Sequence, residues 1–307
     1  MKPFNKPAKT FAEQIELLKA RGMQFANEQD AQFYLEQINY YRLGAYWLPF
    51  ENTHSPHCFK PDTSFEQVLE LYIFDRELRL LILDAIERVE VAIRTRFAYE
   101  LAHRHGCHAY LQSQYFKPAF RWNSLLESLK TEVSRADEVF IEHYKRTYDD
   151  PELPPIWATC EVMSFGQLSK WYQLLAPIQT RKAISSHFDC DEKQFEGLLH
   201  HFVYLRNICA HHARLWNRKL TKTIAQPRSK PAGLKPQCNF DQNISADRKL
   251  YNSLVFLLHF MDKIAPKHTW RNRLLYLLRT HRNISKTWMG FPEQWESYPI
   301  WQTDQIQ

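Results

Sequence analysis

The sequence predicts an all-α protein, namely a helical bundle preceded by a small helical module. Apolar residues recur at every third or fourth position over long segments of the 307-residue chain, as they do on the buried face of a helix. No segment shows the alternation of apolar and polar residues that marks a half-buried strand. Apolar residues make up 44% of the chain, which suffices for a sizeable core.

The N-terminal module is expected to cover residues 1–62 and to contain two short helices. The first should occupy about residues 10–21, and the second should begin near Glu28. Residues 40–47 then bring several Tyr and Trp side chains together around Arg42. Aromatic rings beside an Arg can stack on bases, but such clusters more often serve as packing between modules. We expect a packing plug here and retain Arg42 as a candidate RNA contact.

Residues 63–307 are expected to form one larger helical domain. Its most regular segment, residues 64–105, repeats apolar side chains at intervals of three and four, which predicts a helix of about 35 to 40 residues ending at Gly106. A proline-rich stretch at about 226–243 is interpreted as a loop or arm. The other helices are expected at about residues 122–144, 156–175 with a bend at Ser164-Phe165-Gly166, 191–218, 246–264 and 269–281.

Composition disfavours several classes of site. Only seven glycines occur, and none are spaced to form a glycine-rich phosphate loop, which argues against a nucleotide-binding fold. The six cysteines are scattered and include no C-x-x-C pair, so neither a zinc ribbon nor a disulfide framework is indicated. We therefore expect no metal and no cofactor.

Charge and hydropathy indicate the setting. The net charge of +6 is compatible with a polyanionic partner such as a nucleic acid. No apolar run has the length of a signal peptide or of a membrane span. We expect a cytoplasmic protein without a membrane partner.

The segment from Arg206 to His211 combines residue types that can cleave RNA without a metal. Arg206 is charged at any working pH and can hold a phosphate through two N–H donors, while the His211 imidazole can transfer a proton near neutral pH. Spacing alone does not select this pair, because two other pairs are spaced similarly, namely Arg181 with His187 and Arg96 with His103.

The predicted helix around this segment favours Arg206 and His211 over the other pairs. At 100° per residue, one apolar stripe should face the core; it consists of Phe195, Leu198, Phe202, Leu205, Cys209, Ala213 and Trp216. The opposite face has no carboxylate and a positive field suited to a phosphate backbone; it consists of His200, Asn207, His211, Arg214 and Arg218. His212 falls toward the apolar stripe and is interpreted as a structural histidine.

Arg206 and His211 do not share one face of an ideal helix, because they are about 140° apart around its axis. Three arrangements would bring them to one substrate. The Arg206 side chain could swing around the helix, the helix could end or bend nearby, or the two residues could meet across a symmetric dimer.

A second cluster of metal-ligating residue types lies at the end of the long predicted helix; it consists of His103, His105, Cys107 and His108. These side chains would have to converge from a frayed helix terminus, and no distant ligand pair is evident. We interpret the cluster as a helix C-terminus whose histidines interact favourably with the helix dipole.

Several further motifs occur in order along the chain: Thr10-Phe11-Ala12-Glu13-Gln14-Ile15 with Arg21-Gly22-Met23, Tyr40-Tyr41-Arg42-Leu43, Phe74-Asp75-Arg76-Glu77-Leu78-Arg79, Pro154-Pro155-Ile156-Trp157 with Ser164-Phe165-Gly166, Arg206-Asn207-Ile208-Cys209-Ala210-His211, and Gly290-Phe291-Pro292-Glu293-Gln294-Trp295. Through these motifs the chain resembles the Abi-like (AbiD/AbiF-type) abortive-infection family of bacterial anti-phage proteins. The core of that family resembles a HEPN domain.

The resemblance implies a HEPN-like helical bundle and a metal-independent endoribonuclease. In HEPN ribonucleases the catalytic motif is an Arg, a polar residue directly after it and a His a few residues further on, which Arg206, Asn207 and His211 match. It implies that the ribose 2′-hydroxyl attacks the adjacent phosphate. His211 would then act as general acid or base, Arg206 would hold the phosphate oxygens, and Asn207 would orient His211 or bind the phosphate.

The resemblance also implies partners. RNA would be the substrate, with Arg214, Arg218 and His200 as further contacts, and two copies of the chain would form a homodimer with a composite site. Whether a small RNA or a protein antitoxin restrains the activity stays open. The alternative is a non-catalytic RNA-binding or RNA-sequestered helical module that uses the same basic face.

Overall fold

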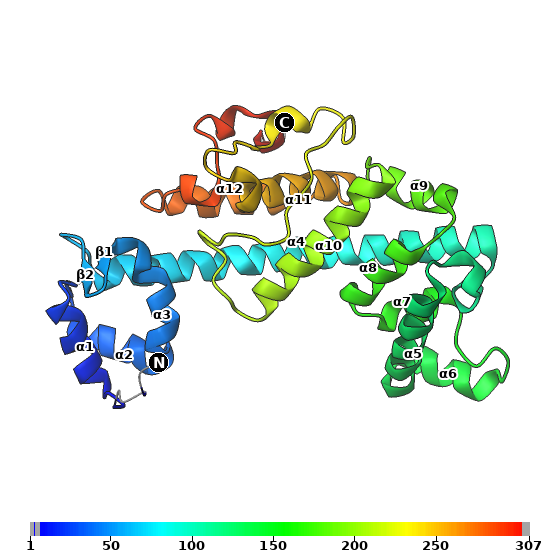
Figure 1. The fold of residues 1–307 in the computed structure, drawn as a ribbon, viewed down its shortest axis with the longest axis horizontal. Helices are drawn as coiled ribbons and strands as arrows, with labels where there is room; N and C mark the ends of the chain where they lie inside the picture. The colour runs from blue at the N-terminus through cyan, green and yellow to red at the C-terminus, as the bar shows by residue number, and fades with distance from the viewer. Residues whose placement is uncertain (1–2, 4–6, 303–307) are drawn as a thin grey trace. The chain divides into compact units, whose positions relative to one another are not determined.

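The computed structural model describes residue 3 and residues 7–302 (Figure 1). These residues form twelve α-helices and one two-stranded sheet, which confirms the all-α fold class. The chain divides into two compact units: an N-terminal unit, up to Arg79 with His281–Ile284, and a larger unit, Leu80–Thr280 and the residues from Ser285 on. The domain boundary expected after residue 62 stays a prediction.

The N-terminal unit begins with three short helices, each started by a side-chain cap. Before α1 (Phe11–Ala20), the Thr10 hydroxyl accepts the Glu13 N–H and the Glu13 carboxylate accepts the Thr10 N–H. The side chains of Asn27 and Asn39 accept N–H groups in the same way before α2 (Glu28–Gln37) and α3 (Tyr40–Trp47). The two short helices predicted in this region are confirmed.

A β-hairpin follows the 3₁₀ turn η1 (Leu48–Phe50). Its strands are β1 (Glu51–His54) and β2 (His57–Phe59), which pair antiparallel. The expectation that the chain has no strand is wrong at this point. Strands of four and three residues are too short to show a periodic pattern, so the sequence carries no signal for them.

The aromatic cluster of α3 is buried on one side only. Tyr46 and Trp47 are buried, and the Tyr46 hydroxyl donates to Asp75 at 2.7 Å. Asp75 also pairs with Arg79 at 2.5 Å. Tyr41, in contrast, is 79% exposed. The inner half of the cluster therefore packs inside the N-terminal unit.

Helix α4 (Phe65–His105) is the longest element, as the sequence predicted. It runs into both compact units. The predicted stop is confirmed, because Gly106 adopts a φ of +100°, which glycine tolerates without steric cost.

Two helices that the sequence predicted as continuous are each divided in two. The segment 122–144 forms α5 (Ala119–Arg135) and α6 (Val139–Thr147), and the segment 156–175 forms α7 (Ile156–Val162) and α8 (Phe165–Leu174). Between α7 and α8, Ser164 does not merely bend a helix. Its hydroxyl accepts the Gln167 N–H and so starts a new one. Helix α9 (Ile178–Ser186) was not predicted.

The core of the larger unit surrounds α11 (Tyr251–Ile264), which is buried on all sides from Tyr251 to Met261. Phe260 on α11 stacks on Phe188 at a ring-centroid distance of 5.1 Å. The remaining helices are α10 (Glu192–Ala210) and α12 (Trp270–Thr280).

The chain between α10 and α11 is irregular, with the short 3₁₀ turns η4 (Lys235–Gln237) and η5 (Ala246–Arg248). The predicted loop at 226–243 lies within this stretch, and the helix expected from residue 246 starts at Tyr251. Within the described residues, every helix is too short or too polar to cross a membrane.

Candidate functional site

Helix α10 fixes the position of the predicted site through its buried face. Five residues of the predicted apolar stripe on this helix are buried: Phe195, Leu198, Phe202, Leu205 and Cys209. Of these, Phe202 contacts Phe260 of α11 edge-on, with ring centroids 5.3 Å apart. Because this face is held in the core, the opposite face is presented outward.

The helix ends at Ala210, which corrects the prediction that it continues to Arg218. His212 adopts the left-handed conformation with a φ of +56°. The N–H groups of His212 and Ala213 donate to the carbonyls of Cys209 and Ile208, each at 3.0 Å, and so close the helix in a Schellman motif. Glycine usually occupies the left-handed position, and without a glycine here no residue type marked the end of the helix.

The early helix end changes the interpretation of the two histidines. His211 is the C-cap residue. His212 is exposed, so the expectation that it faces the apolar stripe is wrong. Its structural role is to close the helix in the left-handed conformation. The sequence allowed a swung Arg206 side chain, a helix that ends or bends nearby, or a symmetric dimer. The structure has a helix that ends nearby, at Ala210, between Arg206 and His211.

Arg206, Asn207 and His211 lie in and directly after the last turn of α10, and all three are exposed. The Arg206 guanidinium donates to the Asn207 side-chain oxygen at 3.5 Å. The His211 N–H donates to the Asn207 carbonyl at 3.0 Å. The three residues of the sequence motif therefore lie near one helix end, and their joint role at a site stays a prediction.

The other two Arg residues of similar spacing have different surroundings. Arg181 pairs with Glu196 at 2.5 Å, and Arg96 pairs with Glu100 at 3.3 Å. Within the part of the chain that the structure describes, Arg206 forms no ion pair. Its charge is therefore not offset by a carboxylate, which suits a phosphate contact.

Tyr204 is a site residue that the sequence reasoning missed. It joins His200, Asn207 and His211 in a stripe along α10, at intervals of four, three and four residues. The Thr221 N–H donates to its hydroxyl at 3.3 Å. Burial raises the pKa of the Tyr204 phenol, but hydrogen bonds to Thr221 and the nearby Arg218 outweigh burial, and the pKa is lowered. The helical spacing of Tyr204 relative to His200, Asn207 and His211 could have identified it from the sequence.

Arg214 and Arg218 do not extend the face of α10, contrary to the prediction, because they lie beyond the helix end. The chain instead turns back. The Arg218 guanidinium donates to the Arg214 carbonyl at 3.3 Å, and its charge acts on Tyr204. This turn of the chain therefore places the Arg218 side chain beside Tyr204 of the polar stripe.

Arg214 belongs to a cationic cluster with Lys219 and Lys249. Lys249 donates to the Asn217 side-chain oxygen at 3.0 Å. Burial lowers the pKa of Lys249, and the charges of Lys219 and Arg214 lower it further. Mutual repulsion of this kind is relieved by a bound anion. No sequence pattern connects Lys249 with the motif, so this residue was missed.

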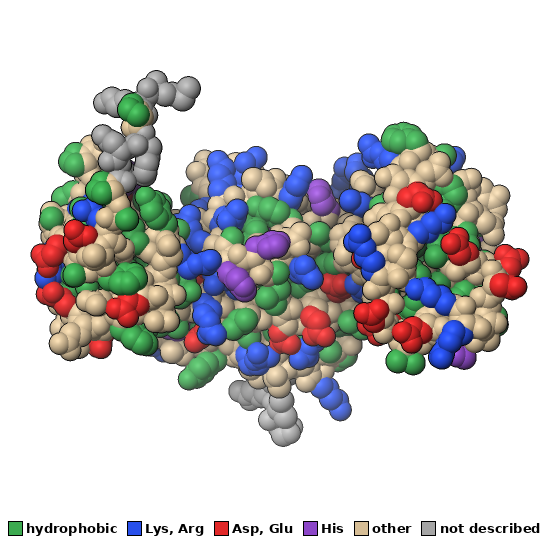
Figure 2. Space-filling view, turned by 90° about the horizontal axis from the view of Figure 1, so that it is seen from below, with side chains coloured by type: hydrophobic (Ala, Val, Ile, Leu, Met, Phe, Trp, Pro, Cys, Tyr) green, Lys and Arg blue, Asp and Glu red, His purple; other side chains and the backbone are tan. Residues whose placement is uncertain are grey.

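The surface view agrees with this distribution. The central part of Figure 2, which belongs to the larger unit, shows histidine side chains gathered among Lys and Arg. Such a surface attracts a polyanion.

Two predicted RNA contacts lie apart from the motif. His200 is exposed and lines a groove between α8, α9 and α10. It is about 16 Å from His211 along the helix axis, so the two histidines cannot contact the same phosphate. Arg42 is exposed on α3, in the N-terminal unit.

The second predicted cluster does not converge on one point. His103 contacts the Tyr99 carbonyl at 2.8 Å, and His105 contacts the Thr180 hydroxyl at 2.7 Å. Within the described residues, a group of side chains that could hold a metal ion occurs elsewhere, at Glu51, His54 and His57.

Comparisons with known proteins point to one family. The model of the family described as Abi-like protein matches residues 33–217, which is more than half of the chain. The match includes α10 up to its end, with Arg206, Asn207 and His211. The motifs at residues 10–23 and 290–295 lie outside the match. No curated protein and no solved structure matches the chain.

Proposed function

The chain belongs to the Abi-like protein family, and we propose that it acts in abortive infection as a metal-independent endoribonuclease of the HEPN type. The observation that carries this proposal is the group Arg206, Asn207 and His211, which are exposed together at the end of α10. Among residues 7–302, no carboxylate pairs with Arg206. An RNA substrate implies a cytoplasmic location.

The proposed reaction uses the ribose 2′-hydroxyl as nucleophile. A bond forms from the 2′-oxygen to phosphorus, the bond from phosphorus to the 5′-oxygen breaks, and the products carry a 2′,3′-cyclic phosphate and a 5′-hydroxyl. His211 removes the proton of the 2′-hydroxyl while water protonates the leaving 5′-oxygen, or it protonates that oxygen while water takes the 2′ proton. Arg206 stabilises the extra negative charge that develops on the phosphate oxygens. Asn207, which already accepts from Arg206, orients that guanidinium.

The surrounding cations would hold the RNA backbone. Arg218 lies beside Tyr204, which belongs to the same stripe as His211. Arg214, Lys219 and Lys249 form the cationic cluster. Phosphate contacts of this kind position the strand without reading its sequence. His200 would contact a neighbouring part of the strand, and Arg42 is a candidate contact from the N-terminal unit.

We also propose that two copies of the chain form a homodimer with the motif of each copy at one cleft. The site at the end of α10 is exposed, and a symmetric contact would close it and double its charge. Sedimentation should then give twice the 36.8 kDa mass of the chain. A small RNA or a protein antitoxin would restrain such an activity.

The direct test compares RNA cleavage by the native chain with cleavage by His211→Ala. The expected loss is about 100- to 10,000-fold, the range associated with a general acid or base. His143→Ala is the matched control, because His143 is also an exposed helical histidine. It should cleave RNA at the native rate.

The second candidate function is RNA binding without cleavage. The cationic cluster favours it, because Arg214, Lys219 and Lys249 can bind an anion without any proton transfer. Native protein that binds RNA in a salt-dependent way but leaves it uncut would support this function. Cleavage that His211→Ala abolishes while RNA affinity persists would exclude it.

A further inference from the structure

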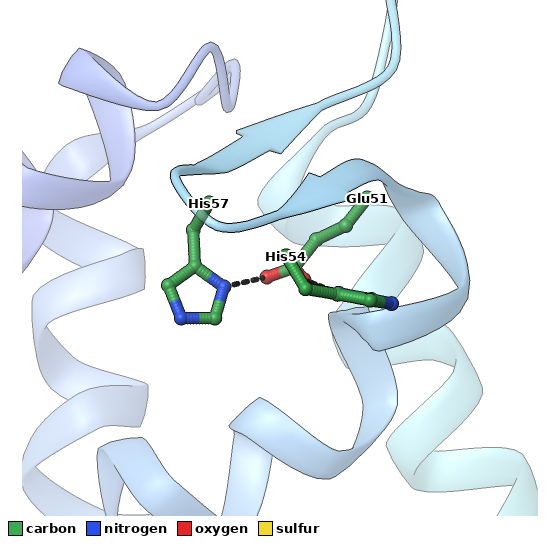
Figure 3. A group of neighbouring side chains, drawn as sticks. All are labelled: Glu51, His54 and His57. Carbon is green, nitrogen blue, oxygen red and sulfur yellow. Dashed lines mark hydrogen bonds and ion pairs between the residues drawn. The ribbon is translucent and has the colours of Figure 1, made fainter.

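The hairpin of the N-terminal unit brings three metal-ligating side chains together at its turn. Glu51 lies in β1, His54 ends that strand, and His57 begins β2. The His57 Nδ1 atom is 3.0 Å from one oxygen of the Glu51 carboxylate, and the His54 Nδ1 atom contacts the other oxygen. Figure 3 shows the His57 imidazole pointing at this carboxylate and the His54 imidazole beside it, seen edge-on. One ligand atom from each residue lies within 4.8 Å of the other two.

An irregularity in strand β1 allows all three side chains to lie on one face of the hairpin. His54 and His57 are direct cross-strand partners, so their side chains lie on one face of the hairpin. In a regular strand Glu51 would point to the other face, because it is three residues from His54. The register shifts between Glu51 and Thr53, and this bulge turns Glu51 to the same face as the histidines.

The burial of the three residues differs in a way that suits a metal site. The Glu51 side chain is fully buried, whereas the side chains of His54 and His57 are 65% and 44% exposed. In the described residues the ionic partners of this carboxylate are the two histidines, and no Lys or Arg pairs with it. Burying a carboxylate is costly without compensating partners, and a divalent cation bound by neutral imidazoles would be such a partner.

We propose that Glu51, His54 and His57 bind a divalent first-row transition metal ion, for which Zn²⁺ is the best match. Two imidazoles and one carboxylate are a ligand set of transition metals, whereas Ca²⁺ and Mg²⁺ prefer oxygen ligands throughout. Three protein ligands leave a fourth position for water or an external ligand, on the side where the histidines are exposed. This site is independent of the proposed RNA cleavage, which needs no metal.

The geometry needs only a small adjustment to bind the ion. With bonds of about 2.0 to 2.1 Å, tetrahedral Zn²⁺ places its ligand atoms about 3.4 Å apart. The His57 Nδ1 atom and the Glu51 carboxylate oxygen are 3.0 Å apart, about 0.4 Å short of this spacing. Rotation of the exposed imidazoles can bring the remaining atoms to it.

The test uses the full chain, purified without a histidine tag and freed of metal by a chelator. Calorimetric titration with Zn²⁺ should give one ion per chain. His54→Ala and His57→Ala should each weaken binding by more than about 100-fold, because even residues behind the ligands account for about 10- to 100-fold. His143→Ala, which removes an exposed histidine from α6, should keep the native affinity.

Loss of Zn²⁺ binding in both hairpin variants, with melting temperatures close to that of the native apoprotein, supports the site. Absence of binding by the native chain overturns it, as does equal affinity in the native chain and the two variants. Because a variant that fails to fold decides nothing, X-ray absorption by the native Zn²⁺-loaded chain provides a second measurement. Two imidazole ligands with oxygen in the remaining positions support the site, whereas sulfur ligands or oxygen ligands alone overturn it.

Discussion

At the scale of single residues, Arg206 differs from the other candidate Arg residues in its partner. Arg181 and Arg96 precede a histidine at a spacing similar to that of Arg206, but each is paired with a Glu. Arg206 instead donates to the neutral side chain of Asn207. Its full charge is available to a phosphate, to which a guanidinium can donate two parallel hydrogen bonds.

Replacing His212 with Val should destabilise the protein more than replacing it with Asn. Both changes remove the imidazole, but a β-branched side chain clashes at a φ of +56°, whereas Asn tolerates this conformation. We expect the free energy of unfolding to be about 1–2 kcal/mol lower for Val than for Asn, measured by denaturant titration. Equal stabilities would contradict a helix end at this residue.

The residues of the motif could be predicted from the sequence because they lie close together in one helix. The buried stripe of α10, from Phe195 to Cys209, follows from periodicity for the same reason. The contact between Tyr204 and Arg218 could not be predicted, because it depends on how the chain turns after the helix. Lys249 reaches its cluster through tertiary structure alone.

At the scale of elements, the end of a helix could be predicted where a Gly or Pro marks it. Gly106 ended α4 as expected. The end of α10 has a histidine where glycine is usual, and the break between α5 and α6 contains neither Gly nor Pro. Boundaries of this kind depend on tertiary packing, so they cannot be predicted from a local sequence pattern.

Gly290→Ala should disturb the cationic cluster. Gly290 ends the 3₁₀ turn η6 (Thr287–Met289) with a φ of +86°, and an added Cβ would lie 2.5 Å from the Cβ of Lys249. We expect a loss of about 1–3 kcal/mol in the free energy of unfolding, together with weaker RNA binding. Thermal unfolding and a filter-binding assay measure the two effects.

Gly197→Ala is the control for this prediction. Gly197 lies in α10, where an added Cβ meets no atom within 4 Å. Because Ala favours a helix over Gly by about 0.5–1 kcal/mol, this variant should be slightly more stable than the native chain. If Gly290→Ala is as stable as Gly197→Ala, the close contact with Lys249 is not a constraint.

At the scale of the whole molecule, stability should fall in acid because buried histidines stay neutral in the folded state. His201 on α10 contacts the Lys222 carbonyl and the Ser253 hydroxyl, each at 2.8 Å, and burial lowers its pKa to about 4. An unfolded histidine has a pKa of about 6.5. Between these values the unfolded chain binds a proton that the folded chain does not, so stability is lost as pH falls.

The contribution of His201 can be isolated by comparing the native chain with His201→Asn. Between about pH 6 and pH 4.5 the free energy of unfolding of the native chain should fall more steeply, by about 1.4 kcal/mol per pH unit, than that of the variant. Denaturant titrations at several pH values measure both slopes. Parallel slopes would mean that His201 takes up its proton without unfolding.

The central proposal for the molecule is that Arg206 and His211 cleave RNA without a metal. The most direct measurement incubates the purified chain with total RNA in excess EDTA and determines the ends of the fragments. Metal-independent cleavage by these residues predicts 2′,3′-cyclic phosphate and 5′-hydroxyl ends from the native chain, and intact RNA with the double variant Arg206→Ala/His211→Ala. Cleavage only after Mg²⁺ is added, or equal cleavage by the double variant, would contradict it.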